Sequence, residues 1–177
     1  MLTMVIDRTY KFDRKIKGRN IRECAAGVLV AGLFALVAWN SPNLLARAGN
    51  ALVAASGVWV IVYLLRFGRA GATPATDCSL ADFQQALLRK YDDQIRLLKR
   101  VKFWYLLPPY VGLLMASAGI VMANIAKGQP YWPQLIAMVS YSALFAVVWW
   151  LNESFAARKL EGRRQRLLEE MQSTAGD

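Results

Sequence analysis

Apolar and polar residues are separated into long blocks along this chain. Four stretches are apolar and nearly free of charge, while most of the charged residues fall in residues 7–23, 66–102 and 153–177. A helix needs about 20 apolar residues to cross roughly 30 Å of hydrocarbon, and each apolar stretch approaches or exceeds that length. The pattern therefore predicts four membrane-spanning helices, at residues 24–39, 48–65, 103–126 and 131–151.

Short polar connections join the first span to the second and the third span to the fourth. The segments NSPNLLAR and KGQP contain the Pro, Asn and Gly residues that are typical of turns. Each pair of spans is therefore expected to form a helical hairpin. The predicted fold class is all-α, an integral membrane four-helix bundle made of two hairpins, with amphipathic helices outside the membrane.

The polar blocks divide the chain into five segments. A basic amphipathic helix at residues 1–23 is expected to lie along the membrane surface, because apolar residues recur at helical spacing among its Lys and Arg residues. The two hairpins occupy residues 24–66 and 103–152. Residues 67–102 are expected to form a linker and an amphipathic helix, and residues 153–177 a charged helical tail.

Basic residues give the chain a net charge of +10 and a direction in the membrane. Seven Lys or Arg residues precede the first span, eight lie between the second and third, and five follow the fourth, whereas each hairpin turn has one. The positive-inside rule places both termini and the middle segment in the cytoplasm. Since topology already requires this charge, no nucleic acid partner is expected. Six basic residues before the first span are expected to bind anionic lipid headgroups and to fix the topology: Lys11, Arg14, Lys15, Lys17, Arg19 and Arg22.

Residues 79–102 carry one apolar stripe at helical steps of three and four. Two interpretations stay open. The stripe packs on the bilayer or on a neighbouring helix of the same chain, or it forms a docking face for a partner. The stripe consists of Leu80, Phe83, Leu87, Tyr91, Ile95 and Leu98.

Small residues recur at three- and four-residue steps in the first and third spans. Such stripes let helix backbones approach closely within a membrane. They indicate packing inside the bundle or, alternatively, a homodimer face. The stripes are Gly27, Ala31, Ala35, Gly112, Ala116, Gly119 and Ala123.

Pro108 and Pro109 lie close to the start of the third span. Proline is well accommodated in the first turn of a helix, where its missing N–H has no helical partner. The pair therefore indicates a junction between a surface helix and the span, or alternatively a kink that opens and closes.

The residues of common catalytic and metal sites are absent from the sequence. It contains no His, its two Cys residues are far apart, and no Asp, Glu, Lys or Arg lies deep in a predicted span. Proton relays and ion pathways normally need such a residue. No enzymatic activity, metal or cofactor is therefore expected.

The segment LLRKYDDQIRLLKRVKFWYLLPPYVGLLM, residues 87–115, resembles a motif of small four-span bacterial inner-membrane proteins, in which a basic amphipathic helix runs into a span. The segment KFDRKIKGRNIRE resembles their amino-terminal region. Such proteins are often encoded beside extracytoplasmic-function sigma factors. The resemblance implies an inner-membrane location and a regulatory role, with a cytoplasmic regulatory protein as a possible partner.

Two functions are consistent with the sequence. The first is a regulatory or scaffold protein that binds a cytoplasmic or membrane partner through its amphipathic helices. The second is a small transporter or channel subunit, which could be a homodimer or another homo-oligomer.

Overall fold

The computed structural model describes residues 2–68, 80–151, 154 and 158–175. These residues form six α-helices and one π-helical turn, and no strand occurs among them. The elements are α1 (Leu2–Trp39), α2 (Leu44–Phe67), α3 (Leu80–Lys99), η1 (Lys102–Leu106), α4 (Leu107–Ala126), α5 (Trp132–Leu151) and α6 (Arg158–Ala175).

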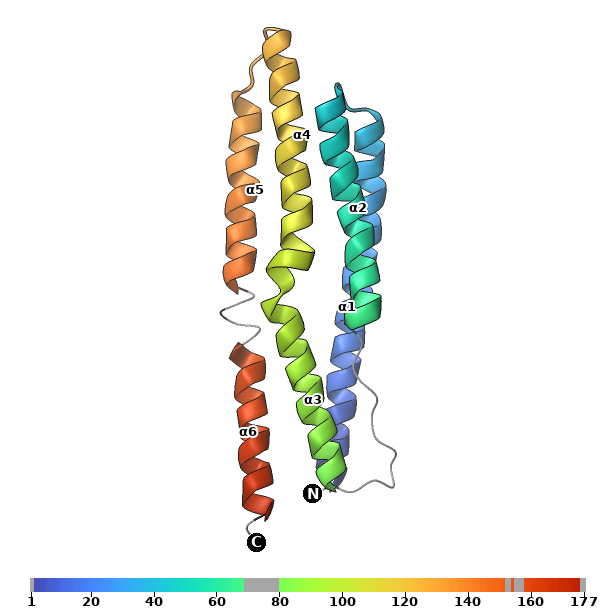
Figure 1. Cartoon of the computed structure of the whole chain (residues 1–177), viewed down its shortest axis with the longest axis vertical. Coiled ribbons are helices and arrows are strands. Elements are labelled where there is room, and N and C mark those ends of the chain that lie inside the picture. The colour runs from blue at the N-terminus through green and yellow to red at the C-terminus, as the bar shows by residue number, and fades with distance from the viewer. Residues whose placement is uncertain (1, 69–79, 152–153, 155–157, 176–177) are drawn as a thin grey trace.

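The molecule is elongated, and its two ends differ in character (Figure 1). The two hairpin turns lie at one end, whereas both termini, α3 and α6 lie at the other. We call the part formed by α3, α6 and the first half of α1 the basal bundle. Four helices are long and apolar enough to cross a membrane, which confirms the all-α fold with four predicted spans and makes the chain a multi-pass membrane protein. They are Thr9–Trp39, Leu44–Phe67, Phe103–Ala126 and Trp132–Leu151.

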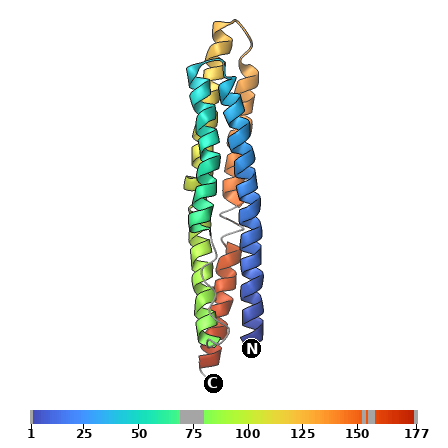
Figure 2. The same cartoon turned by 90° about the vertical axis from the view of Figure 1, so that its right-hand side faces the viewer.

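Helix α1 is one uninterrupted helix of 38 residues, about 57 Å long at 1.5 Å per residue. It runs from the basal bundle up to the turn that leads into α2 (Figure 2). The structure therefore differs from the surface helix expected for residues 1–23. A helix along the membrane surface would have to turn sharply where the span begins, and no proline is present there to break the helix.

Helices α1 and α2 approach each other closely at two glycines. A Cβ atom placed on Gly27 would lie 2.9 Å from the carbonyl oxygen of Gly57, and a Cβ atom on Gly57 would lie 3.1 Å from the backbone nitrogen of Ala31. Two other members of the small-residue stripes are less enclosed, since Ala35 is exposed and Ala123 is half-buried.

The small-residue stripe of α4 lies against α2. A Cβ atom on Gly112 would lie 2.8 Å from the carbonyl oxygen of Gly49, and one on Gly119 would lie 2.8 Å from the Cα atom of Ala46. A Cβ atom on Gly49 would collide with the backbone of Ala116. The structure thus places this stripe inside the bundle, where two backbones touch.

Asn43 connects the start of α2 to α4. Its side-chain oxygen accepts a hydrogen bond from the backbone N–H of Ala46 at 2.8 Å, which caps the helix. Its amide nitrogen donates to the carbonyl oxygen of Gly119 at 2.6 Å. The Asn43 side chain therefore caps α2 and also bonds the start of α2 to α4.

Helix α5 lies on the outside of the bundle. It packs mainly on α4 and has little contact with α1 or α2. The Ser117 hydroxyl of α4 accepts hydrogen bonds from Gln134 at 2.8 Å and from Tyr141 at 2.7 Å. No residue of α5 is buried, so most of its surface is left for lipid.

The third span begins at a π-helical turn, η1, that follows α3. Pro108 and Pro109 fall in the first turn of α4, where a missing N–H leaves no helical bond unmade. Trp104 of η1 is buried, stacks on Tyr63 at 4.6 Å between ring centroids, and donates to the carbonyl oxygen of Leu97 at 3.2 Å. The prolines therefore lie at a junction, and a gating movement at this point stays a prediction.

Candidate functional site

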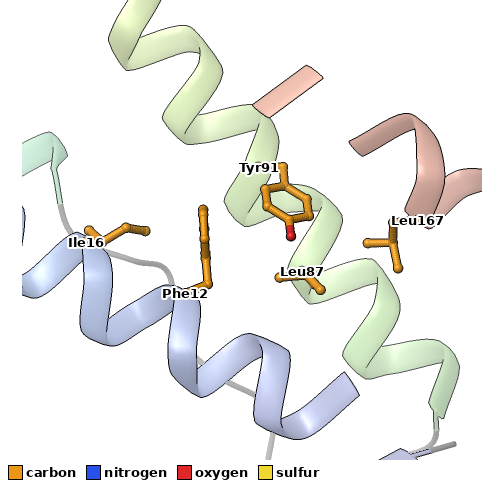
Figure 3. Packing of buried hydrophobic residues seen from close by; sticks show 5 residues of the cluster. All are labelled: Phe12, Ile16, Leu87, Tyr91 and Leu167. Atoms are coloured by element: carbon orange, nitrogen blue, oxygen red, sulfur yellow. The ribbon is translucent and has the colours of Figure 1, made fainter. Parts of the chain in front are cut away.

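In the basal bundle, α3 packs against both α1 and α6. Leu87 and Tyr91 of α3 meet Phe12 and Ile16 of α1 and Leu167 of α6 in one buried cluster (Figure 3). The rings of Phe12 and Tyr91 meet edge to face, with centroids 4.8 Å apart. Burying an apolar side chain of this size contributes about 1.5–3 kcal/mol. The cluster therefore holds three helices together in a part of the chain that is rich in charge.

The apolar stripe of α3 is used inside the chain. Phe83 and Leu87 are each 1% exposed, Tyr91 and Ile95 are also buried, and Leu98 is half-buried. The side chain of the remaining member, Leu80, lies outside the described residues. The stripe therefore packs mainly on neighbouring helices of the same chain, and docking of a partner on it stays a prediction.

A buried ion pair joins α1 to α3. The Nζ atom of Lys90 lies 2.9 and 2.7 Å from the two carboxylate oxygens of Asp13, and the Lys90 side chain is only 2% exposed. An ammonium group removed from water needs a partner charge, because desolvating it alone costs several kcal/mol. The pair therefore fixes one alignment of α3 on α1.

Two further polar contacts tie α1 to the ends of α2 and α3. Arg19 donates to the Gln94 Oε1 atom at 2.8 Å, and Asn20 donates to the carbonyl oxygen of Gly68 at 2.7 Å. Arg19 is thus half-buried and bonds within the protein through one terminal nitrogen, and its role as a headgroup-binding residue stays a prediction. The other five basic residues assigned to headgroups are exposed: Lys11, Arg14, Lys15, Lys17 and Arg22.

Ion pairs on the surface orient α6 against α3. The Nε atom of Arg164 lies 2.6 Å from Asp92 Oδ1, and the Nζ atom of Lys99 lies 2.8 Å from Glu161 Oε1. All four side chains are at least one-third exposed, so each pair contributes about 1 kcal/mol at most. With these ion pairs in place, the face of α6 that carries Leu167 packs against the basal bundle.

A groove of about 340 Å³ lies between α1 and α6, with residues of α3 in its floor. The floor is apolar and belongs to the cluster of Figure 3. We call it the basic groove because four basic residues and one acidic residue line its rims: Lys11, Lys15, Arg163, Arg166 and Glu170.

The basic groove lies outside the hydrocarbon, next to the end of α1 that precedes the predicted span. The candidate span Thr9–Trp39 has 31 residues and is about 46 Å long, more than the roughly 30 Å of hydrocarbon. Counting back roughly 30 Å from Trp39, the last residue of α1, puts the edge of the hydrocarbon near residue 20, so Lys11 lies about 13 Å and Lys15 about 7 Å outside it. The polar layer on each side of the hydrocarbon is only about 5–8 Å thick. Lys11 therefore lies beyond this layer, and Lys15 lies near its outer edge.

A second hollow, the span cavity, lies between the four spans and has a volume of about 350 Å³. Its walls come from α1, α2, α4, α5 and η1 and are apolar apart from Glu23, Ser56 and Tyr105. At one end, the Tyr105 hydroxyl donates a hydrogen bond to Glu23 Oε2 at 2.7 Å.

The sequence indicated functional residues on the α1 rim of the basic groove but singled out none on the α6 rim. Arg163 and Arg166 belong to the predicted charged helical tail, residues 153–177, which fits either solvent or a partner. The spacing of Leu160, Leu167 and Met171, seven and then four residues, is a helical signal that the tail packs on another helix. No comparable pattern marks the pair of Glu23 and Tyr105, because the two residues are 82 positions apart.

The two features described here are a groove with basic rims and a cavity between the spans. Among the residues that the structure describes, no three His, Cys, Asp or Glu side chains gather as a metal site. Cys24 is a free, half-buried thiol, and Cys78 lies outside the described residues. Comparisons with family models, with curated proteins and with solved structures find no match for this chain, so the resemblance of residues 87–115 stays a prediction.

Proposed function

We propose that this chain is a membrane-embedded regulatory or scaffold protein that docks a soluble cytoplasmic partner in the basic groove. The observation that carries the proposal is the groove itself, which combines an apolar floor with basic rims outside the hydrocarbon. An inner-membrane location follows from the resemblance, and the asymmetry of Lys and Arg favours a cytoplasmic basal bundle.

The occupant that fits this groove is an amphipathic helix with acidic edges. An apolar stripe on such a helix would cover the floor of the groove, as in other helix-in-groove complexes. Its Asp or Glu residues would meet the four basic rim residues, and opposite charge speeds encounter and fixes orientation. Since α1 and α6 have little contact with each other, the partner helix would complete a four-helix bundle.

A photoreactive amino acid at position 15 of the full-length chain, in native membranes, tests this proposal. Lys15 lines the groove, whereas Lys17 is exposed on α1 and does not line it, so position 17 is the matched control. We expect irradiation to attach a soluble protein at position 15 through an acidic amphipathic segment, identified by mass spectrometry of the adduct. The double variant Arg163→Glu/Arg166→Glu should remove that adduct.

Other outcomes of this experiment contradict docking. Lipid adducts at position 15 would mean that the rim lies in the headgroup layer. Equal protein adducts at positions 15 and 17, or adducts that the Arg163→Glu/Arg166→Glu variant leaves unchanged, would show contact without use of the groove.

The alternative function, a small transporter or channel subunit, has one observation in its favour, which is the span cavity of about 350 Å³. Flux of a solute into liposomes that contain the purified chain tests it. Flux that a bulky residue in the cavity abolishes would support transport, and flux equal to that of empty liposomes would argue against it.

A further inference from the structure

The span cavity is open toward the lipid on one side. Its lining includes Val30 and Phe34 of α1 and Leu144 and Phe145 of α5, yet α1 and α5 have little contact with each other. A volume of about 350 Å³ lies within the range of ligand-binding pockets. Within a membrane, a gap between two spans admits lipid chains from the side.

The depth of the cavity matches one leaflet. Its lining on α1 extends from Glu23 to Phe34, which is 11 residues and about 16 Å along the helix. Half of a hydrocarbon layer roughly 30 Å thick is about 15 Å. The polar end of the cavity therefore lies near one membrane surface, and its apolar end lies within the hydrocarbon, past the middle of the membrane.

The polar end carries two opposite charges, one helical turn apart. Glu23 Oε2 accepts the Tyr105 hydroxyl, and Glu23 Oε1 has no hydrogen-bond partner among the described residues. A smaller adjoining cavity of about 220 Å³ shares Glu23 and Tyr105 with the first and extends to Arg19. Arg19 donates its hydrogen bonds to Asn20 and Gln94 through one terminal nitrogen, Nη2, and guanidinium has five N–H donors in total.

We propose that the span cavity binds one phospholipid with a primary-amine headgroup. One acyl chain fills the apolar cavity from Phe34 toward Glu23, the lipid phosphate binds Arg19, and the headgroup folds back so that its ammonium group binds the Glu23 carboxylate. A phospholipid whose headgroup carries no positive charge would bring only negative charge next to Glu23 and is therefore bound less tightly. This inference does not depend on the docking function, and its failure would leave that function untouched.

The test uses the full-length chain, delipidated in mild detergent, with defined lipids added back. Phosphatidylethanolamine should raise the thermal unfolding temperature and appear as a single bound lipid in native mass spectrometry. Phosphatidylglycerol with the same acyl chains should bind about tenfold less tightly, which corresponds to about 1.4 kcal/mol. Glu23→Gln should abolish this preference between the two lipids.

Two tryptophan variants distinguish lipid bound in the span cavity from lipid on the outer surface of the spans. Val30→Trp fills the cavity and should remove the bound lipid, whereas Leu29→Trp, at a position that is 73% exposed and outside the lining, should leave it in place. If Val30→Trp does not fold, a photoreactive residue at Phe34 in native membranes gives the same information, with position 33 as the exposed control.

The outcomes of these measurements are distinct. A lipid adduct at position 34 that is absent at position 33 supports the site. An adduct with a second copy of the chain would mean that a helix of a homodimer fills the cavity, which overturns the proposal. Equal stabilisation by both phospholipids, or a bound lipid that Val30→Trp leaves in place, would also overturn it.

Discussion

Lys90 and Asp13, which are 77 residues apart in the sequence, form an ion pair whose ammonium group is almost fully removed from solvent. The pair joins α3 to a part of α1 that the span does not need for crossing the membrane. Because either charge alone would be costly in this position, the contact selects one way of packing α3 on α1 and sets the position of the basic groove.

Replacing one member of this pair should destabilise the basal bundle. We expect Asp13→Asn to lower the free energy of unfolding by about 3 kcal/mol, because the buried Lys90 ammonium group would lose the charge of the Asp13 carboxylate. The matched variant Asp13→Leu/Lys90→Met removes both charges and should cost much less. Denaturant unfolding of the purified protein, followed by tryptophan fluorescence, measures the difference. Equal losses in the two variants would contradict a role for the uncompensated charge.

The crossing of α2 and α4 should not tolerate a side chain at Gly49. Even a Cβ atom there meets backbone atoms of Gly112 and Ala116, which cannot move aside as a flexible side chain does. We expect Gly49→Leu to cost about 1–3 kcal/mol of stability, measured as a lower temperature of unfolding in detergent. Gly32→Leu is the control, since a Cβ atom at Gly32 meets nothing within 4 Å. A similar loss in both variants would mean that leucine itself, and not the crossing, is responsible.

The attachment of α5 to α4 should depend on the hydroxyl group of Ser117. This hydroxyl accepts bonds from Gln134 and Tyr141, and interhelical hydrogen bonds in membranes contribute about 0.6 kcal/mol each on average. We expect Ser117→Ala to destabilise the protein by about 1 kcal/mol in a titration with sodium dodecyl sulfate. Ser140→Ala should have no effect, because the exposed Ser140 hydroxyl bonds only to the carbonyl oxygen of Ile136 in its own helix.

The orientation of the chain can be measured by cysteine labelling. In a background of Cys24→Ser and Cys78→Ser, we expect a membrane-impermeant maleimide to label Lys127→Cys in intact cells with a permeabilised outer membrane. Lys15→Cys should react only after the inner membrane is opened. The expectation follows from the concentration of basic residues at the basal end. The reverse labelling pattern would place the basic groove outside the cytoplasm and remove the proposed cytoplasmic partner.

The membrane part of the fold could be read from the sequence, because crossing hydrocarbon imposes a length and an apolar composition on each span. The four spans and their turns followed from that constraint alone. The path of residues 1–23 did not, since an apolar edge such as Phe12 and Ile16 fits a membrane surface as well as a neighbouring helix. Only the contact with Leu87 and Tyr91 decides between the two.

The candidate sites were harder to predict for a related reason. Each one combines residues from segments that are distant in the sequence, as Lys15 with Arg166 in the basic groove and Glu23 with Tyr105 in the span cavity. Periodicity within one helix shows which face is apolar, but it does not show which other helix covers that face. The sequence therefore did not predict that α6 packs on α3, and only the structure shows this contact.

The continuity of α1 also has a consequence for motion. Because no break interrupts the helix between the first span and the basal bundle, a rotation of the span about its own axis carries Lys11 and Lys15 through the same angle. Inserting one residue after Arg22 would turn one part against the other by about 100°, and inserting seven would restore the original facing to within about 20°. Helix α1 thus relates the angular position of a span in the membrane to the direction in which the basic groove faces.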